Sequence, residues 1–161
     1  MKVMLVDDER LALVGLEKML GEFDGCQVIG SFSKAELAIQ HIREFQPDAV
    51  FLDIHMPGLN GLGATERIRA IAPNTQIVYV TAYDEYAIQA FELEAIDYVM
   101  KPLRRARLSQ TIKRLREYAA IKSESLEEEG LLYHCLGAMK IRKPDGEWEV
   151  LKWRTTKAKE L

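Results

Sequence analysis

The chain has 161 residues, of which 48% are hydrophobic, 29% charged and 8% aromatic. This is the composition of a globular protein, and it excludes a disordered, collagen-like or disulfide-rich chain. The formal net charge of −3 is uneven, since residues 131–161 hold seven Lys/Arg against four Asp/Glu and residues 1–130 hold the other 15 against 21.

Short apolar runs alternate with segments of helical periodicity over the first 120 residues. Strands are expected at residues 2–6, 27–32, 49–53, 76–81 and 96–100. Helices are expected between these strands and after the last one, near residues 11–20, 33–45, 61–71 and 84–94 and from about residue 103. Ser33 and Glu36 are expected to form a capping box at the start of the second helix. This alternation predicts a doubly wound α/β fold with a five-stranded parallel sheet.

Polar side chains occupy the ends of four of these strands. Asp7 and Asp8 follow the first, Asp53 ends the third, Thr81 ends the fourth and Lys101 follows the fifth. Because the carboxyl ends of parallel strands meet at one edge, we expect these side chains to lie together. Carboxylates can bind Mg²⁺, a lysine and a threonine can contact phosphoryl oxygens, and a carboxylate can attack phosphorus. The pattern predicts an aspartyl-phosphate site.

Each of these residues also fits a purely structural role. An Asp-Asp pair after a strand is commonly a solvated turn, a threonine at a strand end is commonly structural, and Lys101-Pro102 is a common helix entry. Their coincidence at four strand ends of one sheet favours the functional interpretation. No glycine-rich phosphate loop occurs, so the sequence does not indicate nucleotide binding.

Residues 1–122 resemble the receiver domain of bacterial two-component response regulators. The resemblance is carried by four segments, Val6–Glu9, Phe51–Gly61, Val80–Ala82 and Asp97–Pro102. It implies a flavodoxin-like sheet of strand order 2-1-3-4-5. It also implies that Asp53 accepts a phosphoryl group from a sensor histidine kinase.

The resemblance further implies a Mg²⁺ site. Asp8, Asp53 and the main-chain carbonyl of His55 would bind the ion, and Asp7 would assist through water. We also expect the side chain of His55 to tune the access of water to the acyl phosphate.

A switch is implied at the other strand ends. Thr81 would move toward the phosphoryl oxygen and Tyr98 would turn inward behind it. Lys101 would pair with the phosphoryl group, and the bond between Lys101 and Pro102 would be cis.

The tail has its own pattern. Residues 123–130 are acidic and end in glycine, as in a linker or a helix extension, and residues 131–142 and 147–153 suggest two strands joined by a turn at 144–146. The fold class therefore includes a C-terminal β-hairpin extension.

Two output types fit the sequence. The segment Trp153–Leu161 resembles the opening of the winged-helix output domain of the bacterial transcriptional activator type, which makes residues 131–161 its truncated N-terminal part. Its recognition helix would lie beyond Leu161, so DNA would be bound only through a complete output domain. The segment Thr81–Tyr98 is similar to receivers joined to this type or to the LytTR type, which is the alternative, beside a single-domain relay or scaffold.

The sequence thus predicts a phosphorylation-activated response regulator. It would use Mg²⁺, receive its phosphoryl group from a sensor histidine kinase and form a homodimer through the fourth helix, fifth strand and fifth helix. It would catalyse only its own phosphotransfer and autodephosphorylation. A Mg²⁺-dependent phosphohydrolase is disfavoured, because no acid stands two residues after Asp53. The short apolar runs and the acids at Asp7-Asp8 predict a cytoplasmic protein without a membrane span.

Overall fold

A computed structural model describes the backbone of residues 1–137, 140–142 and 148–150 and the side chains of residues 1–123. The chain divides into two compact units, Met1–Glu117 and Tyr118–Leu161. Among the described residues, no helix combines the length and the apolar character that a membrane crossing requires.

The first unit is built on a five-stranded parallel sheet. Its strands are β1 (Lys2–Val6), β2 (Gln27–Phe32), β3 (Ala49–Leu52), β4 (Gln76–Thr81) and β5 (Asp97–Met100). They lie in the order β2-β1-β3-β4-β5, and each neighbouring pair is parallel. The predicted fold class and strand order are confirmed for this sheet.

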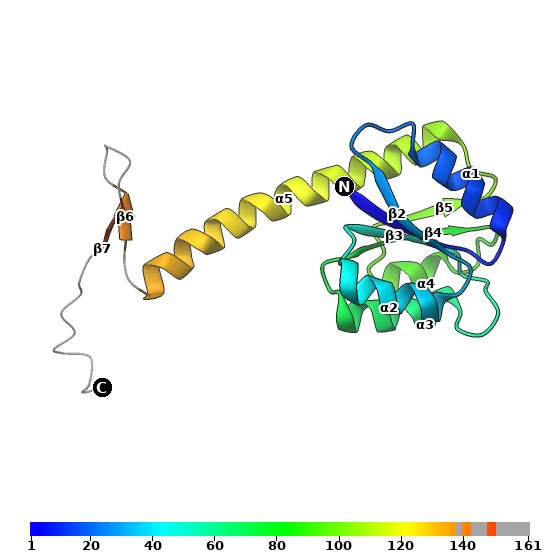
Figure 1. Cartoon of the computed structure of the whole chain (residues 1–161), viewed down its shortest axis with the longest axis horizontal. Coiled ribbons are helices and arrows are strands. Elements are labelled where there is room, and N and C mark those ends of the chain that lie inside the picture. Colours follow the sequence, from blue (N-terminus) through cyan, green and yellow to red (C-terminus); the bar gives the residue numbers. More distant parts are fainter. Residues whose placement is uncertain (138–139, 143–147, 151–161) are drawn as a thin grey trace. The chain divides into compact units, whose positions relative to one another are not determined.

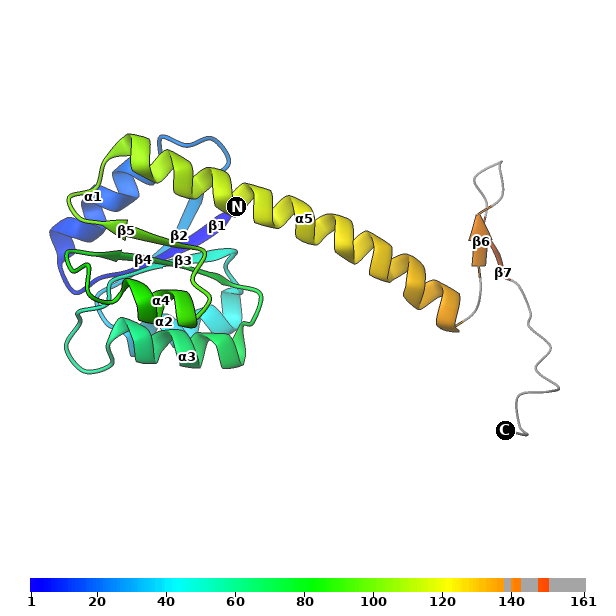
Figure 2. The same cartoon turned by 180° about the vertical axis from the view of Figure 1, so that it is seen from behind.

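Helices cover both faces of the sheet (Figures 1 and 2). They are α1 (Arg10–Leu20), α2 (Ala35–Phe45), α3 (Gly61–Ile71), α4 (Ala87–Glu92) and α5 (Arg105–Gly137). Helices α1 and α5 lie on one face, and α2, α3 and α4 lie on the other. Right-handed crossovers between parallel strands produce this two-sided arrangement.

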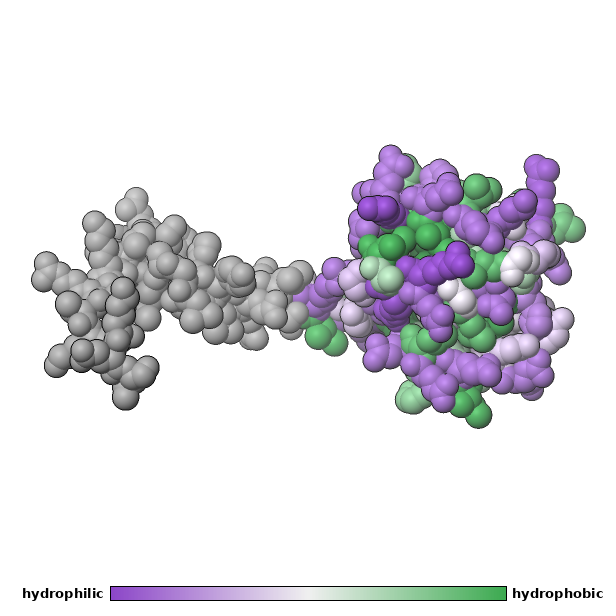
Figure 3. Space-filling view, turned by 90° about the horizontal axis from the view of Figure 1, so that it is seen from below, coloured by the Kyte–Doolittle hydropathy of each residue, from purple (hydrophilic) through white to green (hydrophobic). Residues whose placement is uncertain are grey.

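The core divides at the sheet, because side chains alternate along a strand. In β1, Val3 and Leu5 join the cluster with α1 and α5, whereas Met4 and Val6 join the cluster with α2 and α3. Strands β1, β3 and β4 are buried on both faces, which explains their continuous apolar runs. Outside the core, the face seen from the α2–α4 side is mostly hydrophilic with scattered apolar groups (Figure 3).

Two local predictions are wrong in this unit. Helix α2 has Lys34 as its N-cap and no side-chain capping bond, so Ser33 and Glu36 do not form a capping box. Instead, Oε1 of Glu36 accepts a hydrogen bond from the backbone N–H of Leu59 at 3.3 Å. The fourth helix is shorter than the predicted residues 84–94, because its first residues form a bend and a turn before Ala87.

The tail differs from its predicted pattern. Residues 123–130 are helical, which agrees with the predicted helix extension and not with a linker. Helix α5 continues to Gly137. A strand beginning at residue 131 is therefore wrong over 131–137, since extending an existing helix adds one backbone hydrogen bond per residue and outweighs weak strand propensity.

Among the described residues of the second unit, one strand pair is antiparallel. Strands β6 (Lys140–Arg142) and β7 (Trp148–Val150) pair with Ile141 opposite Glu149. The predicted turn at 144–146 and the segment Trp153–Leu161 lie outside the described residues. The predicted hairpin extension and the output-domain boundaries therefore stay predictions.

Candidate functional site

Three acidic side chains meet at the carboxyl edge of the sheet. Asp7 and Asp8 directly follow β1, and Asp53 directly follows β3, the strand that pairs with β1. Each offers a carboxylate oxygen within 4.8 Å of the others, with Asp7 and Asp53 buried and Asp8 exposed. An all-oxygen group of this kind suits a hard cation such as Mg²⁺.

Lys101 lies between two of these acids. Its Nζ is 2.7 Å from Oδ2 of Asp7 and 3.0 Å from Oδ2 of Asp53. Burial works against the ammonium, but hydrogen bonds from it to both carboxylates outweigh burial and raise the pKa of Lys101. Burial also raises the pKa of Asp7, against the opposing contact with Lys101. The ammonium thus offsets part of the repulsion between the two buried carboxylates.

The backbone around Asp53 is closely packed. Its N–H donates to the carbonyl of Val6 at 2.8 Å, and its Oδ1 accepts from the N–H of Ile54 at 2.7 Å. Gly61, the first residue of α3, lies against it: a Cβ at Gly61 would be 2.2 Å from the carbonyl oxygen of Asp53. Only glycine fits there without displacing the strand end that carries the carboxylate.

Thr81 and Tyr98 both contact the main chain of Tyr83. The hydroxyl of the fully buried Thr81 accepts from the N–H of Tyr83 at 3.4 Å. The hydroxyl of Tyr98 donates to the carbonyl oxygen of Tyr83, and the ring of Tyr98 lies 6.2 Å from that of Tyr79. Partial burial and nearby acids raise the pKa of Tyr98, so its phenol stays protonated as a donor.

A backbone hydrogen bond joins the end of β5 to the end of β4. The N–H of Lys101 donates to the carbonyl of Thr81 at 2.8 Å. The peptide bond between Lys101 and Pro102 is cis.

His55 is exposed in the loop between β3 and α3, two residues after Asp53. It belongs to an aromatic cluster with Tyr83 and Tyr86, both from the loop between β4 and α4. The ring centroids of His55 and Tyr83 are 4.0 Å apart, and those of His55 and Tyr86 are 5.2 Å apart. The sequence indicated a role for His55 but did not indicate that Tyr83 and Tyr86 would contact it.

A second charged group was missed by sequence analysis. The carboxylate of Asp97, which is 3% exposed, is bonded to Arg107, Arg114 and Thr111 of α5. Burial alone would raise its pKa, but the bonds from Arg107 and Thr111 and the N–H of Tyr98 lower it. An acid inside an apolar strand was the available signal. Because Arg107 also donates to the carbonyl of Tyr98, this network joins β5 to α5.

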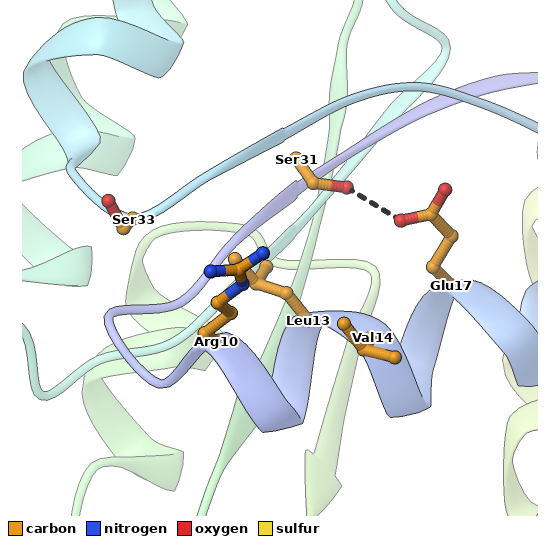
Figure 4. A pocket seen from close by; sticks show the side chains of 6 residues that line it. All are labelled: Arg10, Leu13, Val14, Glu17, Ser31 and Ser33. Atoms are coloured by element: carbon orange, nitrogen blue, oxygen red, sulfur yellow. Dashed lines mark hydrogen bonds between the residues drawn. The ribbon is translucent and has the colours of Figure 1, made fainter.

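A separate pocket of about 390 Å³ lies beside α1 (Figure 4). Side chains of α1 and of the β2 segment line it, namely Arg10, Leu13, Val14, Glu17, Ser31 and Ser33. Two of these residues are bonded to each other, since the hydroxyl of Ser31 donates to Glu17 at 3.2 Å. None of its lining residues belongs to the acidic cluster.

Comparison with known families and proteins agrees with this geometry. A family model described as the response regulator receiver domain matches residues 3–113. The chain is 45% identical over 125 residues to an uncharacterized response regulatory protein of Yersinia pestis, covering 76% of this chain and 51% of that protein. It is 42% identical over 127 residues to the transcriptional regulatory protein BtsR of Escherichia coli K12, covering 78% of this chain and 52% of BtsR. The chain thus spans about half the length of these relatives.

A solved structure shares the fold. The crystal structure of the response regulatory domain of protein mrkE from Klebsiella pneumoniae superimposes with a TM-score of 0.67 at 34% identity. The match covers 77% of this chain and 99% of that domain.

Proposed function

Since this chain belongs to the response regulator receiver domain family, we propose that it is a phosphorylation switch in which Asp53 takes a phosphoryl group from a sensor histidine kinase. One observation carries the proposal: three carboxylates lie within 4.8 Å at the strand ends, and the ammonium of Lys101 contacts Asp53 at 3.0 Å. Receiver domains are not conventional enzymes, so the reaction is the protein's own modification. The cytoplasmic location expected from the sequence is part of this proposal.

Asp53 is the proposed nucleophile. One of its carboxylate oxygens forms a bond to phosphorus, while the bond from phosphorus to the kinase histidine breaks and the imidazole nitrogen keeps the electron pair. Lys101 contacts Oδ2 of Asp53 and supplies positive charge beside the reacting group. Asp7 orients that ammonium through its 2.7 Å contact.

Mg²⁺ is the proposed cofactor, because the donor set fits it. The ligands would be the carboxylates of Asp8 and Asp53 and the main-chain carbonyl of His55, with Asp7 acting through water. When bound, the ion offsets negative charge on the transferring phosphoryl oxygens.

The proposed switch pair is Thr81 and Tyr98. Both bind the main chain of Tyr83, Thr81 at its N–H and Tyr98 at its carbonyl. A Thr81 hydroxyl that moves toward a phosphoryl oxygen to donate to it leaves the N–H of Tyr83, which frees the loop before α4. The loop movement would then release Tyr98 to turn inward, and this couples the site to the surface around α4.

A homodimer through α4, β5 and α5 is proposed as the active assembly. Residues 83–94 contain four acids and no Lys/Arg, whereas residues 104–116 contain six Lys/Arg and no acid. A second copy can pair these opposite charges twice about a two-fold axis. Ile88 and Phe91 are 73% and 83% exposed on α4 and would supply apolar contact.

The proposed output of the whole protein is control of transcription through a DNA-binding domain. The comparisons favour the alternative, a LytTR-type output, over the winged helix. The support for the LytTR type is the 42% identity over 127 residues with the transcriptional regulatory protein BtsR. The segment Thr81–Tyr98 is similar to receivers of both output types and does not separate them. The sequence of the whole reading frame would test this choice.

The experiment that tests the phosphorylation proposal uses this chain directly. Incubation with acetyl phosphate and Mg²⁺, followed by intact-mass spectrometry, should show the addition of one phosphoryl group. The Asp53→Asn variant should add none, while a Ser123→Ala variant at an exposed site on α5 should behave as the wild type. Absence of uptake in the wild type would exclude the proposed function.

A further inference from the structure

We propose that Tyr86 is a positioning residue, whose hydroxyl holds the imidazole of His55 over the approach to Asp53 and so lengthens the life of the phosphorylated state. The proposal rests on the function proposed above and adds a residue outside the strand-end set. It concerns contacts between two loops that leave neighbouring strands at the same edge of the sheet.

The side chains of His55 and Tyr86 are in direct contact. Nε2 of His55 lies 3.1 Å from the hydroxyl oxygen of Tyr86, which is hydrogen-bond distance. The rings meet edge to face at an interplanar angle of 69°, and Tyr83 packs at 4.0 Å with an angle of 44°. An exposed imidazole with one hydrogen bond and two aromatic contacts has fewer rotamers open to it than a free one.

The aromatic cluster lies on the loops that follow β3 and β4. His55 follows Asp53 by two residues, and Tyr83 follows Thr81 by two residues. Strands β3 and β4 are neighbours and parallel, so both loops start beside the acidic cluster. The aromatic cluster therefore bridges the two loops next to the reacting carboxylate.

The proposed switch pair contacts the same loop that holds His55. Thr81 and Tyr98 hold the main chain of Tyr83, and the ring of Tyr83 packs on His55. Tyr86 lies directly before α4, with Asp84 and Glu85 between it and Tyr83. A change in this loop changes both contacts that hold His55.

The affected step is hydrolysis of the acyl phosphate. The oxygen of water bonds to phosphorus, the bond from phosphorus to the Asp53 oxygen breaks, and phosphate and the free carboxylate remain, with the proton of water passing to phosphate or solvent. An imidazole held in place narrows the path of that water. Losing one hydrogen bond to an exposed group corresponds to a roughly two- to fivefold change in the fraction of time the ring is in place.

The test compares Tyr86→Phe, which keeps the ring and removes the hydroxyl, with Tyr118→Phe, which removes a hydroxyl from an exposed residue of α5. Each protein is phosphorylated with acetyl phosphate and Mg²⁺, the donor is removed, and the loss of phosphoryl-Asp53 is followed over time. We expect loss to be about two- to fivefold faster in Tyr86→Phe and unchanged in Tyr118→Phe. Tyr86→Phe added to His55→Ala should have no further effect, because the hydroxyl acts through His55.

A second readout separates positioning from general destabilisation. The ¹⁵N signals of the His55 ring in the unphosphorylated protein should shift in Tyr86→Phe and stay in place in Tyr118→Phe, while thermal melting of both variants stays near the wild type. Unchanged or slower hydrolysis in Tyr86→Phe, or an unshifted His55 signal, overturns the proposal. If the wild type takes up no phosphoryl group, the proposed function fails, and the ¹⁵N comparison still decides whether Tyr86 positions His55.

Discussion

Removal of the Lys101 ammonium is the sharpest perturbation of the acidic site. We expect Lys101→Met to lower the free energy of unfolding by about 2–3 kcal/mol at pH 7. Two unit charges at the observed 2.7 and 3.0 Å attract by about 6 kcal/mol each at an effective dielectric constant of 20. Desolvation of the ammonium cancels much of this. Removing one partner of a buried pair costs about 3–5 kcal/mol, and the 19% exposure of Lys101 reduces the expected cost to about 2–3 kcal/mol.

The pH dependence of this effect has a definite sign. The carboxylates raise the pKa of Lys101, so its stabilising contribution is complete below its ordinary pKa and is lost as the pH rises through the higher folded value. In the variant, Asp7 and Asp53 repel each other without compensation. Burial already raises the pKa of Asp7, and protonation of Asp7 relieves the repulsion, so the difference from the wild type should shrink as the pH falls from 7 to 5.

Urea unfolding at pH 5, 6 and 7, with and without Mg²⁺, measures both effects. Lys113→Met is the matched control, because Lys113 is 77% exposed and lies 3.7 Å from Glu117; it should change stability by at most about 0.5 kcal/mol. Mg²⁺ should stabilise Lys101→Met more than the wild type, since the ion restores positive charge to the acids. A Lys101→Met protein as stable at pH 7 as the control would refute this account.

Three other outcomes are expected. Asp97→Asn should cost about 2–4 kcal/mol in urea unfolding, and because the folded pKa of Asp97 is lowered, the difference should vanish as the pH falls through it; equal loss at pH 3 and pH 7 would contradict this. Gly61→Ala should cost about 1–3 kcal/mol and slow phosphoryl uptake, as its Cβ meets the Asp53 carbonyl, whereas Gly15→Ala has open space and should be neutral or stabilising. Phe91→Glu should keep the melting temperature but prevent dimer formation on phosphorylation, measured by sedimentation; a persistent dimer would place the interface elsewhere.

Sequence reasoning was reliable where one physical rule dominated. Continuous apolar runs marked the strands buried on both faces, and parallel topology then placed Asp7, Asp53 and Lys101 at one edge. It failed where local and distant partners competed. Glu36 has the spacing of a capping box with Ser33, yet its carboxylate binds Leu59, which is 23 residues away in sequence.

Residues 131–137 illustrate a different cause of failure. Their apolar side chains fit a strand as well as a helix, and a short apolar run does not distinguish the two. The backbone is helical because α5 already extends into this segment from Arg105. The helical conformation of the preceding residues therefore decided the secondary structure of residues 131–137.

By itself, the sequence determined the sheet class, the strand order implied by its family resemblance and the set of polar residues at the strand ends. The sheet class and the polar strand ends follow from periodicity and from short-range order, which a chain carries locally. The strand order rests on the resemblance alone. Only the tertiary structure decided which side chains meet: Lys101 binds an acid 48 residues earlier, and His55 binds a tyrosine 31 residues later. Such contacts depend on how loops from different strands pack against one another, and no spacing along the chain encodes that distance.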